Sequence, residues 1–200
     1  MKSAASIRQS AHASRFFVIT GGPGSGKTTL IHALQDAGQV CLPEAGRAVI
    51  QEEVAAGGSA LPWADRTAFA ARMIEKDLAS YRRASSIGGP VFFDRGIPDV
   101  AGYLRLSGLP VPPAVDRAAR MNRYNRRVFI APPWREIFHQ DTERKQDFEE
   151  AMLTHGAMAE TYEQYGYELC ALPLAPVTDR LAFVLARAAE SFDSAAGVEH

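Results

Sequence analysis

The sequence has 200 residues, of which 46% are hydrophobic and 22% are charged, values typical of a globular domain. Its 22 Lys and Arg residues nearly balance its 23 Asp and Glu residues, and the net charge of −1 argues against a protein that coats nucleic acid or an anionic membrane. Two cysteines are too few for a disulfide framework, and no signal peptide or membrane-spanning run is evident, so we expect a cytoplasmic protein.

Short apolar segments alternate with helical patterns along most of the chain. We expect strands at residues 16–20, 40–42, 91–93, 128–131 and 168–172. We expect helices at 27–37, 44–56, 65–85 and 177–192, two short helices within 97–125, and one that follows a charged stretch at 135–150. This alternation predicts an α/β domain with a parallel sheet covered by helices on both faces. The domain is expected to span 15–193, with flexible ends at 1–14 and 194–200.

The sequence GGPGSGKT at residues 21–28 matches the phosphate-loop pattern G-x-x-x-x-G-K-[ST] in full, between a predicted strand and a predicted helix. Its glycines let backbone amides surround an anion, and the helix N-terminus adds its own amides and dipole. The lysine can reach the β- and γ-phosphates, and the Thr28 hydroxyl can bind Mg²⁺. The alternative is a glycine-rich turn with a surface lysine. The candidate nucleotide-binding residues are Gly22, Pro23, Gly24, Ser25, Gly26, Lys27, Thr28 and Thr29.

Charged side chains follow two further predicted strands, at the edge of a parallel sheet where ligands bind. Asp94 ends the third strand and can hold Mg²⁺ opposite Thr28, and Arg95 can grip a phosphoryl group. The alternative for this pair is a helix cap and a surface arginine. Glu44 follows the second strand, where its carboxylate could accept the proton of an attacking hydroxyl or water. The alternative for Glu44 is a first-turn glutamate favoured by the helix dipole.

A charged stretch follows the fourth predicted strand and contains Arg135, Asp141, Arg144 and Lys145. An arginine supplied from a lid can stabilise the charge that develops on a transferred phosphoryl group. We therefore expect Arg144 to be catalytic and Arg135 to contact the nucleotide. The alternative is a solvated helix face.

Neither the histidines nor the aromatic residues point to a particular site. The five histidines show no metal-binding spacing. Trp63, Tyr103, Tyr124 and Trp134 are expected to pack in the core, with the lining of a ring-binding pocket as the alternative.

Over roughly residues 15–190 the chain resembles a bacterial family of small P-loop proteins labelled predicted ATPase or AAA domain. That family is similar to the nicotinamide riboside kinase domain and to nucleoside and nucleotide kinases. The matching stretches are FFVITGGPGSGKTTL, LPEAGRAVIQEE, ALPWADRTAFAARM, GGPVFFDRGIPDVAGYLRLSGLP, YNRRVFIAPPWREIFHQDTERKQDFEEA and YGYELCALPLAPV. The resemblance implies a P-loop NTPase fold with a five-stranded parallel sheet in the order 2-3-1-4-5. It also implies ATP bound with Mg²⁺, a lid after the fourth strand, and a last loop at 173–177 beside the adenine, with Pro173 and Ala175 in contact.

The resemblance also assigns roles to charged residues of this sequence. In the nucleoside-kinase relatives a carboxylate after the second strand activates the acceptor, which matches Glu44. A D-R pair after the third strand matches residues 94–95, and a D-x-x-R lid motif matches Asp141 and Arg144. The likeness does not extend to ring-forming AAA+ motors, because FFDRG lacks their Asp-Glu pair and the length leaves no room for a separate helical lid domain.

Two functions fit these expectations. The first is a small-molecule kinase that transfers the γ-phosphoryl group of ATP to a hydroxyl of a nucleoside-like acceptor. In it Lys27, Thr28 and Mg²⁺ hold the donor, Glu44 is the base, and Arg95 and Arg144 stabilise charge. The second is an NTPase or a regulatory nucleotide-binding switch that acts through a protein partner. The acceptor, the choice between ATP and GTP, and the oligomeric state are left open by the sequence.

Overall fold

The computed structural model describes residues 13–138 and 147–196, with side chains as far as residue 191. Five parallel strands form one sheet in the order β2-β3-β1-β4-β5. The strands are β1 (Phe16–Gly21), β2 (Val40–Leu42), β3 (Val91–Asp94), β4 (Arg127–Ala131) and β5 (Glu168–Ala171). This order confirms the predicted P-loop NTPase fold, and β1 occupies the centre of the sheet because it pairs with both β3 and β4.

Helices connect the strands close to where the sequence predicts them. They are α2 (Lys27–Asp36), α3 (Ala45–Ala56), α4 (Arg66–Ser85), α5 (Ile97–Leu106), α6 (Pro113–Met121), α7 (Phe148–Gln164) and α8 (Val177–Ala196), with a short 3-10 helix η1 (Arg135–Ile137). The structure differs from the prediction in η1, which forms within the charged stretch, and in α8, which continues past residue 192. The predicted flexible ends lie largely outside the described residues, so the domain limits stay predictions.

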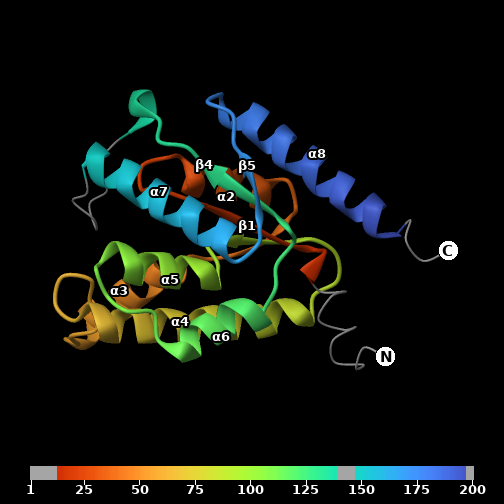
Figure 1. Cartoon of the computed structure of the whole chain (residues 1–200). Helices are drawn as coiled ribbons and strands as arrows, with labels where there is room; N and C mark the ends of the chain where they lie inside the picture. Colours follow the sequence, from red (N-terminus) through yellow and green to blue (C-terminus); the bar gives the residue numbers. More distant parts are fainter. Residues whose placement is uncertain (1–12, 139–146, 197–200) are drawn as a thin grey trace, which may run out of the picture.

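Alternate residues of β1 pack on opposite faces of the sheet. Phe16 and Val18 belong to a core formed with α3 to α7, and Phe17 and Ile19 belong to a second core formed with α2 and α8. All four side chains are completely buried, and each such burial is worth about 1.5–3 kcal/mol relative to exposure. Helices therefore lie on both faces of the sheet (Figure 1), as the apolar character of the strands predicts.

The topology brings together the loops that follow β1, β2 and β3. Strands β2, β3 and β1 are neighbours and run parallel, so their carboxyl ends lie at the same edge of the sheet. Ile19 of β1 is in register with Asp94 at the end of β3. Among the helices that the structure describes, none is long and apolar enough to cross a membrane.

Candidate nucleotide and acceptor site

The GGPGSGKT segment forms the turn between β1 and α2, with α2 beginning at Lys27. Gly26 precedes the helix with a φ of 77°, a left-handed conformation that glycine adopts without a steric penalty. At Gly22 the restriction is space, because an added Cβ would lie 2.2 Å from the carbonyl oxygen of Ala151 at the start of α7. The loop is therefore held close to α7 at a point where no side chain fits.

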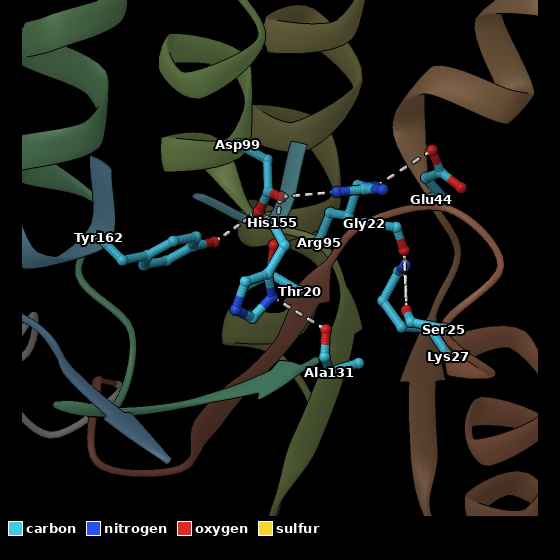
Figure 2. Close-up of polar contacts among 11 residues, drawn as sticks. Thr20, Gly22, Ser25, Lys27, Glu44, Arg95, Asp99, Ala131, His155 and Tyr162 are labelled. Carbon is cyan, nitrogen blue, oxygen red and sulfur yellow. Dashed lines mark hydrogen bonds and ion pairs between the residues drawn. The ribbon is translucent and has the colours of Figure 1, made fainter. Parts of the chain in front are cut away.

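Lys27 lies inside the loop and is only 7% exposed. Its ammonium group donates to the carbonyl oxygen of Gly22 at 2.5 Å and contacts the Ser25 hydroxyl at 3.2 Å (Figure 2). Burial, followed by the nearby charge of Arg95, lowers the pKa of Lys27 to about 7. Both hydrogen-bond partners are uncharged, so a phosphate anion would be a better partner for the ammonium group.

Asp94 at the end of β3 and Thr28 on the first turn of α2 each supply oxygen atoms that can bind a metal ion. Asp94 is 8% exposed, and its Oδ1 is buried with no hydrogen-bond partner among the described residues. Burial, followed by the charge of Glu44, raises the pKa of Asp94 to about 6. Thr28 is exposed on the first turn of α2, beside the equally exposed Thr29. A carboxylate and a hydroxyl suit Mg²⁺, which takes few protein ligands and completes its shell with phosphates and water. The described residues contain no cluster of three metal-ligating His, Cys, Asp or Glu side chains.

Arg95 is held between two carboxylates. Its Nε lies 3.3 Å from Oε1 of Glu44, and its Nη1 lies 3.0 Å from Oδ1 of Asp99 (Figure 2). Its backbone φ is 68°, a left-handed conformation that costs a non-glycine residue about 1–2 kcal/mol. Burial lowers the pKa of Arg95, but Glu44, Asp99 and Asp94 outweigh that effect and raise it, so the guanidinium stays charged. The alternative of a surface arginine is wrong, because the Arg95 side chain is only 14% exposed. Glu44 is the N-cap residue of α3, where the helix dipole also favours its carboxylate, so this alternative stands beside the proposed catalytic role.

Asp99 is a site residue that sequence reasoning missed. Its carboxylate accepts hydrogen bonds from the hydroxyls of Thr20 at 2.5 Å and Tyr162 at 2.6 Å, from the Gly96 amide at 2.9 Å, and from Arg95 (Figure 2). It therefore joins β1, α5 and α7 behind the guanidinium. An Asp four residues after Arg95, at the start of a predicted helix, was the available signal.

A cavity of about 600 Å³ opens beside these charged groups. Pro23 of the phosphate loop lines it together with Glu44 and Arg95, so it adjoins the predicted phosphate site. Its remaining lining comes from the loop after α3 and from α3, α4, α5 and α7: Ala45, Gly46, Pro62, Trp63, Arg66, Phe69, Met73, Asp77, Asp99, Val100, Tyr103, Leu106, Ser107, Glu150, Thr154 and Met158.

Two of the four singled-out aromatic residues line this cavity. Trp63 is 61% exposed there, so the expectation of core packing is wrong for this residue. Tyr103 lines the cavity while its ring packs edge-on against Phe69, with centroids 5.3 Å apart. Tyr124 is buried in the core as expected, and Trp134 is half-buried.

Of the charged residues predicted in the lid, the structure describes only Arg135. Arg135 is exposed, and its guanidinium carbon lies 4.1 Å from the centre of the Phe148 ring. That ring in turn contacts Phe138 edge-on at 5.4 Å. Asp141, Arg144 and Lys145 lie outside the described residues. The roles of Arg135 and Arg144 therefore stay predictions.

Another missed residue, Arg180, connects the last helix to the phosphate loop. It lies in the first turns of α8 and is 3% exposed, and its Nη1 donates to the carbonyl oxygen of Ser25 at 3.0 Å. Burial lowers its pKa. Pro173 and Ala175 are half-buried in the loop between β5 and α8. The predicted adenine loop therefore leads directly into a helix that is fixed to the phosphate loop.

Solved structures share this fold at low sequence identity. The NadR protein crystallised with NR has a TM-score of 0.69 and 19% identity, with 98% of this chain aligned to 54% of that one, so this chain spans about half its length. Deoxyadenosine kinase from M. mycoides has a TM-score of 0.61 and 11% identity, covering 86% of this chain and 97% of that one. Thymidylate kinase from Ehrlichia chaffeensis has a TM-score of 0.54 and 18% identity, covering 87% and 97%.

Comparison of the sequence with curated proteins and with family models gives a single family. No curated protein matches the chain. A family model described as an AAA domain matches residues 16–180, from the first residue of β1 to Arg180 in α8. The match therefore includes the phosphate loop, Glu44, the residues around Arg95 and the loop before α8. The chain belongs to this AAA-domain family, and its fold is that of P-loop nucleoside and nucleotide kinases.

Proposed function

We propose that this protein is a kinase that transfers the γ-phosphoryl group of ATP, bound with Mg²⁺, to a hydroxyl group of a nucleoside-like molecule. The observation that carries the proposal is the cavity of about 600 Å³ that Pro23, Glu44 and Arg95 line together. Water as an acceptor needs no such space, whereas a small organic molecule does. The names of the structural neighbours support this choice, since two of them are kinases of nucleosides or nucleotides.

The donor half of the proposal rests on the phosphate loop. Residues 22–29 hold the triphosphate through backbone amides, with Lys27 against the β- and γ-phosphates. Thr28 and Asp94 hold Mg²⁺, which when bound neutralises charge on the phosphate oxygens. Pro173 and Ala175 contact the adenine, and Arg135 contacts the nucleotide. The neighbour NadR has been crystallised with AMP-PNP and deoxyadenosine kinase with dATP, which is consistent with this half.

The acceptor half rests on Glu44 and Arg95. The acceptor hydroxyl gives its proton to the Glu44 carboxylate while its oxygen bonds to the γ-phosphorus, and the bond from that phosphorus to the oxygen of ADP breaks. Arg95 holds Glu44 in place through the contact at 3.3 Å, and it is itself fixed by Asp99 at 3.0 Å. Arg144 is proposed to add positive charge from the lid.

The test is the release of ADP from ATP and Mg²⁺, with and without a panel of nucleosides. We expect at least one nucleoside to raise the rate and to appear as a phosphorylated product. Turnover that no compound raises would instead support an NTPase, or a switch that acts through a protein partner. Lys27→Ala serves as the control for turnover by contaminating enzymes.

A further inference from the structure

The Asp77 carboxyl group, on α4, lines the cavity without a partner. Its side chain is 7% exposed, and it makes no hydrogen bond or ion pair with the residues that the structure describes. Burial, followed by the charges of Asp99 and Glu44, raises its pKa well above the ordinary value. Asp99, in the same cavity, has four donors. A buried carboxyl group without donors lowers stability, so its presence points to a partner that the described residues do not supply.

The charges around the cavity indicate what that partner is. The carboxyl and guanidinium groups in its described lining are four acids and two bases: Glu44, Asp77, Asp99, Glu150, Arg66 and Arg95. Arg95 is already engaged by two carboxylates, and Arg66 is exposed and donates to the Pro62 carbonyl oxygen. A phosphate group on the acceptor would therefore enter a negatively charged space that offers no unengaged buried cation among these lining residues.

We infer that the acceptor is an unphosphorylated compound, uncharged or cationic, that presents an N–H donor to Asp77. This inference rests on the proposed function and narrows its substrate class to nucleosides as opposed to nucleoside monophosphates. Phe69, Tyr103 and Trp63 supply aromatic faces for a nitrogen-containing ring. Asp77 is then the residue that selects this ring, while Glu44 and Arg95 act on the hydroxyl.

Matched pairs of probes separate these substrate classes. The pairs are adenosine with AMP, cytidine with CMP, and nicotinamide riboside with its mononucleotide. Binding to the full chain loaded with AMP-PNP and Mg²⁺ is measured by calorimetry, and turnover with ATP by ADP release. We expect at least one nucleoside to bind, with its monophosphate at least about tenfold weaker, which corresponds to about 1.4 kcal/mol.

Variants of Asp77 test its role directly. Asp77→Leu should raise the KM for the productive nucleoside at least tenfold while the KM for ATP stays the same. Asp77→Asn, which keeps an acceptor oxygen, should recover part of that loss. Glu75→Gln is the matched control, because Glu75 is an exposed acid on the same helix, and it should change neither KM.

The outcomes distinguish this inference from the kinase proposal. A monophosphate that binds or reacts better than its nucleoside would overturn the inference and leave the kinase proposal standing. Nucleoside binding that Asp77→Leu abolishes, without phosphorylated product, would support the inference and contradict the kinase proposal. Nucleoside KM values unchanged in Asp77→Leu, or no binding of any nucleoside, would overturn the inference.

Discussion

The two halves of the proposed site are built in opposite ways. The donor half is a continuous segment, residues 21–28, that relies on backbone amides, a helix N-terminus and one buried lysine. The acceptor half gathers side chains from α3, α4, α5 and α7, and acids outnumber bases in its described lining. A triphosphate is the same in every such reaction, so a local motif can recognise it, whereas the acceptor requires selectivity that distant side chains provide.

The two halves also differ in which of their features lower the stability of the folded state. The phosphate loop uses glycine where the backbone is left-handed, so its shape carries little steric cost. The acceptor half instead contains Arg95 in a left-handed conformation and Asp77, which has no hydrogen-bond partner in the part of the chain that the structure describes. Features of this kind persist where surrounding contacts enforce them and concentrate at functional sites. The comparison predicts that acceptor-side variants alter chemistry and stability separately from nucleotide binding.

The largest expected effect is that of Glu44→Gln. We expect the rate of transfer to fall by about 10²–10⁴-fold, because the amide cannot take the proton of the acceptor hydroxyl. Binding of ATP and Mg²⁺ should be retained, since Glu44 belongs to the acceptor half. Steady-state kinetics and calorimetry measure the two properties separately. An unchanged rate would remove Glu44 from the mechanism.

On the donor side, Lys27→Ala should abolish stabilisation by ATP and Mg²⁺. A ligand at one hundred times its dissociation constant stabilises the fold by about 2.7 kcal/mol, and thermal unfolding detects this shift. Lys76→Ala is the matched control, because Lys76 forms a partly exposed ion pair with Glu52 and does not line the cavity. An ATP-induced shift that survives in Lys27→Ala would contradict the proposed phosphate site.

A smaller effect is expected of Asp77→Asn, which should increase the free energy of unfolding. The folded state holds the Asp77 proton more tightly than the unfolded state, because the pKa is raised well above its ordinary value. This contribution to stability is complete below the unfolded pKa of about 3.9 and is lost as the pH rises through the folded pKa. The free energy of unfolding of Asp77→Asn should therefore exceed that of the parent by about 1–3 kcal/mol at pH 8, with a much smaller difference at pH 4.

Asp99→Asn sharpens this test, because Asp99 is equally close to the cavity but has four hydrogen-bond donors. Replacing it should lower the free energy of unfolding at neutral pH, opposite to Asp77→Asn. Denaturant unfolding across the pH range measures both variants. A destabilised Asp77→Asn would show that Asp77 has a structural role.

Much of the fold could be predicted because its signals are local. The apolar run at residues 16–20 is buried on both faces of a parallel sheet, and the strand predicted at 91–93 ends at Asp94. Glycines and prolines mark most element ends. The start of α7 within the charged stretch, which lacks such a marker, has a local cause. Asp147 is the N-cap residue of α7, and its side chain accepts a hydrogen bond from the Glu150 amide at 2.8 Å.

The site was only partly predictable, because most of its side chains depend on packing between distant segments. Asp99 receives hydrogen bonds from Thr20 and Tyr162, which lie 79 and 63 residues away along the chain. Arg180 reaches the Ser25 carbonyl oxygen across 155 residues. Periodicity and spacing describe the chain over a few turns and cannot relate such positions.

By itself, the sequence determined the alternation of strands and helices, the phosphate loop and the charged residues at the strand ends. These follow from apolar periodicity and from backbone conformations that only glycine readily adopts. Tertiary structure alone decided that Arg95 lies between Glu44 and Asp99, that Asp77 has no partner over residues 13–138 and 147–191, and that a cavity adjoins them. Burial and the pairing of charges are properties of packed helices, because a carboxyl group in solution always finds water as its partner.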